Sequence, residues 1–560
     1  MTAPQPPTEL ASGRTPGHPG GATAVALAEA PANALAAAAF GAREARAACA
    51  RVGDGRLLRD AADYVVIGSG AAGATAARAL ARAGADVLLV EEGPPFVPAA
   101  PPADVTVAQM RYFRDHGANF IGGRSMMPVL QGRCVGGSTA INSAITWRLP
   151  DDVYGTWGED AAVAAAWPQH VLEARFEELE RDLGVRPIDR AVLGRNNTLM
   201  EQGAHALGFD GRVIERNETG CRGSARCVQG CPNGAKQSMN LSFVPDAQRH
   251  GARLWTGCAV RRLVRPLGSG PAAARGWIVE ADFQDFDAPA PSEAWGPAAE
   301  IHARRAVLVA ASALQTPCLL RRSGLAGAGG VAGDYFTCHP GTAVGGVFDD
   351  PVRMWEGATQ GWESAHFRAE RFKLEAIALP PALLTARLPG AGTTLMHAVA
   401  EMAHVALWAV QIRPRGRGRV RPAGRGGFRA RFDLAPEDVT TLRRAVRLLC
   451  EMMFAAGARE ALPGIYGLPP RVRRGELDLI DRAPLDTRAY NLVATHLFGT
   501  ARMGSDPASS VVAPRTLEHH DAPGVFVLDS SVFPTNLGVN PQHAIMAIAA
   551  EATARLLDRH

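Results

Sequence analysis

The stretch DYVVIGSGAAGATAARALARAGADVLLVEEG, residues 63–93, constrains the fold more than any other part of the chain. An apolar run leads into three glycines, Gly68, Gly70 and Gly73, which have the spacing GxGxxG. An alanine-rich segment and a second apolar run follow, and Glu91 ends the second run. This order predicts a strand, a tight turn, a helix and a second strand, the unit of a Rossmann-type α/β fold.

Each glycine of this unit has a physical role in binding a dinucleotide. Gly68 permits the tight turn, Gly70 lets the backbone approach a pyrophosphate, and Gly73 lets the helix lie close to the strand. The helix N-terminus offers free N–H groups and a positive dipole end to phosphates. Glu91 stands where an acidic side chain binds ribose hydroxyls. The pattern predicts a dinucleotide site but does not separate FAD from NAD.

Length and charge limit the class of protein. A chain of 560 residues predicts two or three domain-sized units. A formal net charge of +4 is too small to favour a nucleic-acid partner. The first residues lack the pattern of a secretory signal, and no apolar run is long enough for a transmembrane helix. Nine cysteines, an odd number, argue against a secreted disulfide scaffold, so we expect a cytoplasmic protein.

Composition also marks segments outside the first motif. Residues 1–21 are rich in proline and glycine and are expected to be disordered, and 22–52 to form a helical extension interrupted at Pro31. Breaks are expected at 93–104, 266–276 and 287–297. The segment 413–431 holds eight arginines, and an exposed pair of strands is favoured over an RNA-binding segment. The apolar stretch 395–412 is expected in the core, with contact to a membrane surface as the alternative.

Three further segments combine close backbone turns with polar side chains. GRCVGGSTAIN, residues 132–142, contains Gly136 and Gly137, followed by Ser138 and Asn142. VLVAASALQTPCLLRRSGL, residues 307–325, predicts a strand, a turn and a helix. In residues 524–557 a strand ends at Asp529, and a final helix is expected to begin at Asn540-Pro541.

Taken together, these segments and HLFGTARMG, residues 496–504, resemble the glucose–methanol–choline (GMC) family of FAD-dependent oxidoreductases. The matching segments run in family order from about residue 60 to the C-terminus. The resemblance implies a discontinuous, Rossmann-type FAD-binding domain from 59–150, 220–340 and 488–560. It also implies an α+β substrate-binding domain with an antiparallel sheet from 151–219 and 341–487. Residues 1–58 lie outside the resemblance and are expected to be a partly disordered N-terminal extension.

The resemblance also implies a set of FAD contacts. In some members a histidine directly before the asparagine of the second motif binds FAD covalently, and here that position is Ile141, so we expect non-covalent FAD. Val260 matches a position whose backbone meets the adenine, and Asp529 an acid near the ribityl–pyrophosphate part. The expected contacts are Gly68, Gly70, Ala71, Ala72, Gly73, Glu91, Gly136, Gly137, Ser138, Asn142, Val260, Asp529 and Pro541.

His496 and Asn540 match the family's catalytic pair. A lone histidine beside an apolar run is more often a packed core residue, but alcohol oxidation needs a proton acceptor, which suits imidazole. The resemblance implies that His496 accepts the proton and that Asn540 orients the alcohol oxygen. Asn540 and Pro541 also suit the N-cap and first position of the last helix. His543 is expected to be packed or solvated rather than to line the pocket.

The cysteine-rich segment CRGSARCVQGCPNGAKQSMN, residues 221–240, invites a metal-site interpretation. The spacing of Cys221, Cys227, Cys231 and Cys258 does not suit an iron–sulfur cluster or a zinc site, so no metal is expected. A local disulfide between Cys227 and Cys231 is disfavoured in a cytoplasmic protein. GCPNGAKQS resembles a segment of the branch that includes long-chain alcohol oxidases and membrane-associated sugar and polyol dehydrogenases.

The expected function is FAD-dependent oxidation of an alcohol to an aldehyde or ketone, with oxygen or a quinone-like acceptor taking the electrons. The expected substrate is a bulky, long-chain or alicyclic alcohol, and the alternative is a sugar or polyol. A flavin photoenzyme or lyase acting on fatty acids is a different class, against which the retained His496 and Asn540 argue. A further alternative is a flavin-binding subunit that passes electrons to a partner and does not use oxygen. An NAD-linked enzyme is least favoured, because GRCVGGSTAIN and the C-terminal segment would have no role.

Overall fold

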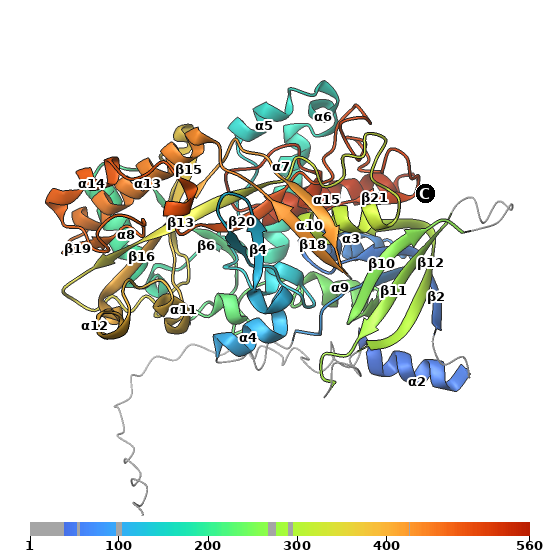
Figure 1. Ribbon diagram of the computed structural model, residues 1–560. Helices are drawn as coiled ribbons and strands as arrows, with labels where there is room; N and C mark the ends of the chain where they lie inside the picture. Colours follow the sequence, from blue (N-terminus) through green and yellow to red (C-terminus); the bar gives the residue numbers. More distant parts are fainter. Residues whose placement is uncertain are drawn as a thin grey trace, which may run out of the picture.

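The computed structural model describes residues 39–52, 57–96, 104–266, 276–288, 295–424 and 426–559. These ranges leave out residues 1–38 and the middle of each predicted break, so the expectations for those segments lie outside the described residues. Two large sheets occupy opposite halves of the molecule, with helices packed around them (Figure 1). The mixture of parallel and antiparallel strands with helices confirms the predicted α/β class.

The first sheet is the Rossmann-type sheet. Its central strands β3, β2 and β12 are parallel, and β11 and β10 continue it in antiparallel pairing. The strand order is β1-β9-β3-β2-β12-β11-β10, with β21 paired to β12. The strands are β1 (Ala39–Phe40), β2 (Leu57–Ile67), β3 (Val87–Val90), β9 (Arg253–Trp255), β10 (Cys258–Val264), β11 (Trp277–Gln284), β12 (Trp295–Val309) and β21 (Val525–Val527).

The second sheet is mainly antiparallel, and only its β18–β4 and β20–β5 pairs are parallel. The order is β17-β18-β4-β5-β20-β13-β16-β15-β14-β7, with β19 paired to β13. Its strands are β4 (Asn119–Gly122), β5 (Met127–Val129), β7 (Arg212–Val213), β13 (Thr337–Val347), β14 (Trp362–Ser364), β15 (Phe372–Ala376), β16 (Val405–Ile412), β17 (Arg419–Ala423), β18 (Gly427–Arg431), β19 (Glu460–Leu462) and β20 (Val493–Phe498). A separate small sheet pairs β6 (Val185–Pro187) with β8 (Glu215–Asn217).

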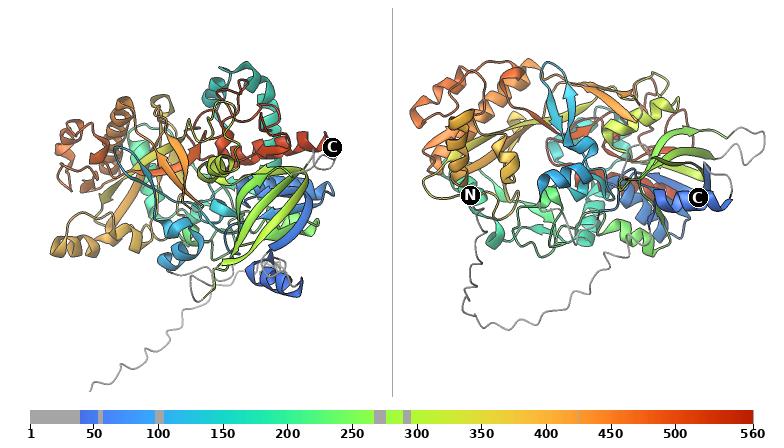
Figure 2. Two further views of the ribbon diagram at one scale, coloured as in Figure 1. Left: turned by 45° about the vertical axis from the view of Figure 1, so that its right-hand side comes forward. Right: turned by 60° about the horizontal axis from the view of Figure 1, so that its bottom comes forward.

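Helices pack against both sheets, and the two views of Figure 2 show the C-terminal helix α15 beside the first sheet. The helix α3 (Ala71–Arg82) buries alanines almost throughout, and these small side chains allow close packing against α15 and α9. The remaining helices are α2 (Ala42–Val52), α4 (Val105–Tyr112), α5 (Asp151–Trp157), α6 (Ala161–Ala166), α7 (Gln169–Leu183), α8 (Arg195–Ala206), α9 (Phe243–Arg249), α10 (Ser312–Arg322), α11 (Pro381–Thr385), α12 (Gly392–Ala400), α13 (Pro436–Ala455), α14 (Asp478–Asp481) and α15 (Gln542–Leu557).

The last part of the N-terminal extension predicted over residues 1–58 packs against the first sheet. Strand β1 pairs with β9, and Phe40 stacks on Trp255 with ring centroids 5.2 Å apart. Ala42 and Ala45 of α2 are buried in the same core as the first sheet. Residues 39–52 therefore belong to this half of the molecule. The alanine-rich sequence predicted the helix, but its small side chains carry too little apolar pattern to predict the packing.

The predicted domain limits also cut across strands of the second sheet. Strands β4, β5 and β20 fall in segments assigned to the FAD-binding domain, yet they pair within the second sheet. Strand β13 crosses the predicted limit at residue 340. Strand pairing joins residues far apart in the chain, so the order of motifs does not predict it. The structure thus brings β20, which carries His496, into the second sheet.

The predicted exposed pair of strands is confirmed, and the predicted core placement of residues 395–412 is confirmed in part. β17 and β18 form an antiparallel pair on which Arg419, Arg429 and Arg431 are exposed. The apolar stretch 395–412 lies in the core only in its second half: β16 is mostly buried, whereas Ala398 is the one buried residue of the preceding helix α12. Within the described ranges, the structure contains no helix with both the length and the apolar character needed to cross a bilayer.

Candidate active site

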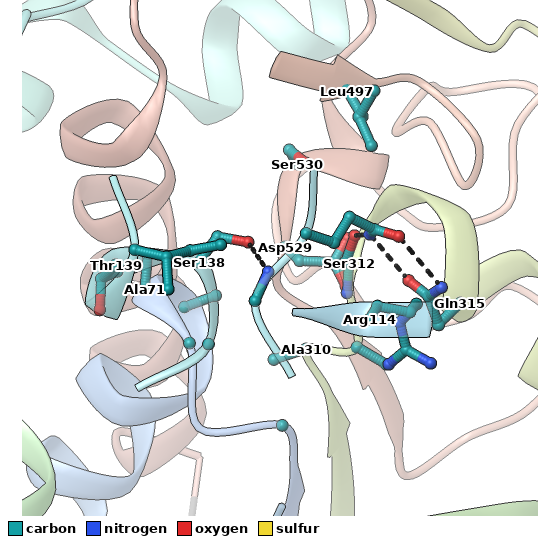
Figure 3. A pocket seen from close by; sticks show the side chains of 18 of the residues that line it. Ala71, Arg114, Ser138, Thr139, Ala310, Ser312, Gln315, Leu497, Asp529 and Ser530 are labelled. Carbon is teal, nitrogen blue, oxygen red and sulfur yellow. Dashed lines mark hydrogen bonds between the residues drawn. The ribbon is translucent and has the colours of Figure 1, made fainter. Parts of the chain in front are cut away.

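A cavity of about 450 Å³ lies where the two sheets meet. The strand ends of the first sheet form one part of its wall, and β20 and the start of α15 form another. All the predicted site residues line it except Gly73 and Gly136, which pack directly behind the wall. Figure 3 shows Ala71, Ser138 and Thr139 on one side of the cavity and Ala310, Ser312 and Gln315 on the other.

The three glycines of the first motif differ in what surrounds them. Gly68 has a φ of +97°, and a Cβ there would overlap the carbonyl oxygen of Ala310. A Cβ on Gly73 would overlap the carbonyl oxygen of Gly68, so the helix can lie against the turn only with glycine at this position. A Cβ on Gly70 would meet no protein atom within 4 Å, although Gly70 lines the cavity. The packing of the protein therefore explains Gly68 and Gly73 but not Gly70.

Glu91 connects the first glycine turn to the second. Its carboxylate accepts hydrogen bonds from the N–H of Ser69 at 3.0 Å, the hydroxyl of Ser69 at 2.6 Å and the N–H of Gly93 at 2.8 Å. The Ser69 hydroxyl in turn accepts from the N–H of Gly136 at 2.9 Å. Burial raises the pKa of Glu91, and these hydrogen bonds oppose the rise. Glu91 thus lines the cavity, and its carboxylate holds the turn at Ser69 and the backbone at Gly93 in place.

The second motif forms a tight turn against the first. Gly136 and Gly137 have φ values of +92° and +53°, and a Cβ on Gly137 would lie 3.0 Å from the Cα of Gly70. The hydroxyl of Ser138 accepts from the N–H of Gly132 at 3.0 Å. Two glycine turns thus approach each other at the edge of the cavity, and both leave backbone exposed to it.

Side chains from the C-terminal segment complete the wall. Asn142 donates to the side chain of Gln542 at 2.5 Å, which ties the second motif to the start of α15. Asp529 accepts from the N–H of Ser312 at 3.1 Å and from the hydroxyl of Thr316 at 2.5 Å, at the start of α10. Burial raises the pKa of Asp529, while these bonds act to lower it. Pro541 and Val260 also line the cavity.

Some lining residues were not predicted. Gln131 donates to Ser312 at 2.9 Å and to Gln315 at 3.0 Å. Arg114 pairs with Glu92 at 2.6 Å. Burial alone would raise the pKa of Glu92, but Arg114 and Arg133 lower it to about 2. These residues lie beside the motifs in the sequence, but nothing in their spacing distinguishes them from surface polar residues.

The cavity suits an elongated ligand that carries a pyrophosphate. Two close backbone turns and the N-terminus of α3 offer N–H groups at one end. The open space beside Gly70 is what a phosphate needs to approach the backbone. The residues present therefore fit a dinucleotide cofactor.

His496 lies on a β-bulge of β20. Cys338 pairs with Leu497 and His339 with Thr495, so His496 is the extra residue between the two pairs. It has a φ of +51°, which is uncommon for a residue with a side chain. Bulges redirect side chains and are frequent beside active sites. Here the bulge leaves His496 on the wall of the cavity.

His496 has a polar group beside each ring nitrogen. Nδ1 lies 3.1 Å from Nδ1 of His339, and Nε2 lies 3.4 Å from Nδ2 of Asn540. His339 is held on its other side, because the N–H of Gly538 donates to its Nε2 at 2.9 Å. Burial and the nearby Lys373 lower the pKa of His496 to about 3. His496 is therefore uncharged at neutral pH.

Asn540 differs in one respect from its predicted helical role. The helix α15 begins at Gln542, Pro541 takes the N-cap position, and no side chain caps the helix. The side chain of Asn540 instead accepts a hydrogen bond from Lys373 at 2.7 Å and faces His496. The side chain of Asn540 therefore does not cap the helix, because it is hydrogen-bonded to Lys373 and faces His496.

His543 is packed, as expected, and does not line the cavity. Its ring stacks on Phe176 with centroids 5.3 Å apart, and its Nε2 lies 3.4 Å from Glu180. Among the residues that the model describes, no group of three or more His, Cys, Asp or Glu side chains has the arrangement of a metal site. Cys221, Cys227 and Cys231 are free thiols, and Cys227 accepts from the buried Arg216 at 3.1 Å.

Comparison with known proteins agrees with this geometry. Family models described as GMC oxidoreductase match residues 62–341 and 414–549. A GMC-type oxidoreductase of Mycobacterium tuberculosis is 36% identical over 504 residues, which cover 87% of this chain and 74% of the relative. A long-chain-alcohol oxidase of Arabidopsis thaliana is 25% identical over 524 residues, which cover 88% of this chain and 68% of the relative.

The solved structure of pyridoxine 4-oxidase from Mesorbium loti has the same fold, with a TM-score of 0.62 and 18% identity over 89% of this chain and 100% of that chain. Enzymes of the matched family use FAD, which fits the dinucleotide cavity described above. The chain belongs to the GMC oxidoreductase family.

Proposed function

We propose that this protein oxidises an alcohol to an aldehyde or ketone with non-covalent FAD. The observation that carries the proposal is the pair of His496 Nε2 and Asn540 Nδ2, 3.4 Å apart at the wall of the cofactor cavity. FAD bound in the cavity would supply the acceptor for the hydride. The protein residues would bind the alcohol oxygen, take its proton and hold its carbon in place.

His496 is proposed as the proton acceptor. Its lowered pKa leaves the imidazole uncharged across the neutral range, so one of its two ring nitrogens can accept a proton. Since Gly538 donates to Nε2 of His339, neutral His339 carries its proton on Nδ1 and donates toward His496. A neutral imidazole accepts at one nitrogen only. When Nε2 of His496 is the acceptor, its Nδ1 carries the proton and cannot accept the hydrogen bond from His339. We propose that this form of His496 reacts.

The proposed substrate is a bulky or long-chain alcohol. The wall of the cavity that His496 lines also includes the apolar side chains of Ile141, Ile145, Val493 and Leu497. A sugar or polyol would leave hydroxyls without partners against such a wall, which costs free energy. The long-chain-alcohol oxidase among the relatives acts, by its name, on substrates of the proposed class.

The decisive experiment is anaerobic bleaching of the flavin spectrum by a panel of alcohols. We expect 1-dodecanol and alicyclic alcohols to reduce the flavin, and sorbitol and glucose to do so far more slowly. The opposite ranking would favour the polyol alternative, and no reduction by any alcohol would refute the proposal. Peroxide formation, measured against dye or quinone reduction, then identifies the electron acceptor.

Ile141 supports non-covalent attachment. It lines the cavity at the position where a histidine would be needed for the covalent bond, and a hydrocarbon side chain cannot form that bond. Acid precipitation of the holoprotein should release all the flavin into the supernatant. Yellow colour retained in the washed pellet would contradict this part of the proposal.

We also propose that the protein binds peripherally to an anionic membrane. Five large apolar side chains between residues 107 and 130, which we term the apolar patch, are 45–65% exposed: Val107, Met110, Phe120, Met126 and Leu130. By strand alternation, Phe120 shares the outer face of the sheet with Arg419, Arg429 and Arg431. Apolar side chains next to exposed cations suit a surface of anionic lipid. Leu130 also lines the cavity, so the patch adjoins it.

Co-sedimentation with vesicles tests this contact. We expect binding to phosphatidylglycerol/phosphatidylcholine vesicles, weak binding to phosphatidylcholine alone, and loss of binding in the Met110→Ser/Met126→Ser variant. Met396→Ser is the matched control, because Met396 is 63% exposed outside the patch. Equal binding by all variants would refute the proposal. A lipid-independent change of oligomeric state in the double variant would instead make the patch an interface between copies.

A further inference from the structure

Lys373 lies directly behind Asn540 and belongs to none of the sequence motifs. It is on β15, and its side chain is fully buried. Its Nζ donates to Oδ1 of Asn540 at 2.7 Å and to Glu363 at 2.7 Å, and it lies 3.0 Å from Glu375. An ammonium has three donors and no acceptor: two of them donate to Asn540 and Glu363, and the third is left for the ion pair with Glu375.

This contact fixes which end of the Asn540 amide faces the cavity. Because Lys373 can only donate, the atom of Asn540 that faces it must be the oxygen. The amide nitrogen is then directed toward His496, which it reaches at 3.4 Å. We propose that Lys373 is a positioning residue that holds Asn540 with its amide nitrogen toward the substrate oxygen. This inference rests on the alcohol oxidation proposed above.

The surrounding charges keep Lys373 protonated. Burial alone would lower the pKa of Lys373, but Glu363 and Glu375 raise it above its ordinary value. Glu363 accepts from Arg212 at its other oxygen, Oε1, at 3.1 Å, and the indole N–H of Trp147 donates at 3.0 Å to the same Oε2 that accepts from Lys373. The two carboxylates thus face two cations. A permanently charged lysine beside the amide keeps Asn540 polarised as a donor.

The charge of Lys373 also acts on the two histidines. After burial, Lys373 is the cause that lowers the pKa of His496. It also contributes, after burial and His496, to the low pKa of His339. Lys373 therefore orients Asn540, and at the same time its charge keeps His496 unprotonated before the reaction.

The test compares Lys373→Met with the wild-type holoenzyme and with Arg212→Met. Arg212 contacts the same glutamate but not Asn540, and it is partly exposed, so it is the matched control. We expect Lys373→Met to bind FAD and to be reduced by dithionite normally. Its reduction by an alcohol that bleaches the wild type should be about 10–100-fold slower. Arg212→Met should stay within about threefold of the wild type.

A second measurement follows the protonation of His496 in the flavin-free protein. Diethyl pyrocarbonate modifies only neutral imidazole, and mass spectrometry reports the rate at His496 between pH 4.5 and 8. We expect no fall of this rate at low pH in the wild type. Lys373→Met should show a fall at the acid end, because loss of the positive charge raises the pKa of His496. If the variant does not fold, Lys373→Met/Glu375→Gln, which removes one charge of each sign, takes its place.

The outcomes separate this inference from the proposed function. A wild type that no alcohol reduces refutes the function, while the modification profile still tests the effect of Lys373 on His496. If alcohols reduce the variant as fast as the wild type, the positioning role is wrong. A slower variant whose modification profile matches the wild type would make Lys373 a support of the fold only, which also overturns the inference.

Discussion

The contrast between Gly70 and Gly73 gives a sharp test of where the cofactor lies. Both belong to the GxGxxG motif, and a sequence pattern treats them alike. A Cβ on Gly70 meets no protein atom within 4 Å, whereas a Cβ on Gly73 would lie 1.8 Å from the carbonyl oxygen of Gly68. Gly70→Ala should therefore impair only ligand binding, and Gly73→Ala should impair folding.

The magnitudes follow from the local backbone. Gly70 has φ and ψ of −71° and −164°, an extended conformation that alanine adopts without strain. Alanine there should leave the flavin-free protein unchanged or stabilise it by about 0.4–1 kcal/mol through the unfolded state. At Gly73 the helix would have to move by more than an ångström, and overpacking of this kind costs about 1–3 kcal/mol or more.

The assay is FAD titration of the flavin-free protein by fluorescence quenching, beside urea unfolding of the same samples. Gly70→Ala should raise the Kd for FAD at least about tenfold, equivalent to ~1.4 kcal/mol. Gly155→Ala is the control, since a Cβ there also meets nothing within 4 Å and the residue does not line the cavity. Wild-type FAD affinity in Gly70→Ala would show that no phosphate approaches this backbone and would refute the reasoning.

The other predictions concern the histidines. His496→Ala should slow flavin reduction by substrate about 10²–10⁴-fold in rapid-mixing absorbance while FAD stays bound, and a near-normal rate would end the assignment of this residue as base. His339→Leu removes the hydrogen-bond donor that occupies Nδ1 of His496. Flavin reduction by substrate should then be about 2–10-fold faster, which corresponds to the net free energy of one hydrogen bond. A slower variant would contradict this. The pKa of His496 is about 3 in the folded protein, below its ordinary value, so between these values the unfolded chain binds a proton that the folded chain does not. The free energy of unfolding should therefore fall more steeply between pH 7 and pH 4.5 in the wild type than in His496→Gln, and equal slopes in urea titrations would count against the shifted pKa.

Local pattern predicted much of this structure. The strand–turn–helix–strand unit from β2 to β3 and the conformations of Gly68 and Gly73 follow from residues close together in the chain. The pairing of β20 in the second sheet does not, because the partners of that strand lie far away in the sequence. Lys373 could not be found for the same reason. A lysine in a strand is ordinarily exposed, and only the fold shows that Glu363, Glu375 and Asn540 surround this one.

The polar groups around His496 fit an oxygen that gains negative charge during the reaction. Once His496 holds the proton at Nε2, that N–H and the amide nitrogen of Asn540 are both donors, and they are too close to face each other without an acceptor between them. A hydroxyl that loses its proton to His496 becomes that acceptor, and it receives both donors. Because Lys373 already occupies the oxygen of Asn540, the amide cannot turn to accept from His496 instead. In the proposed reaction this arrangement stabilises the deprotonated alcohol more than the alcohol itself, which is the condition for lowering the barrier.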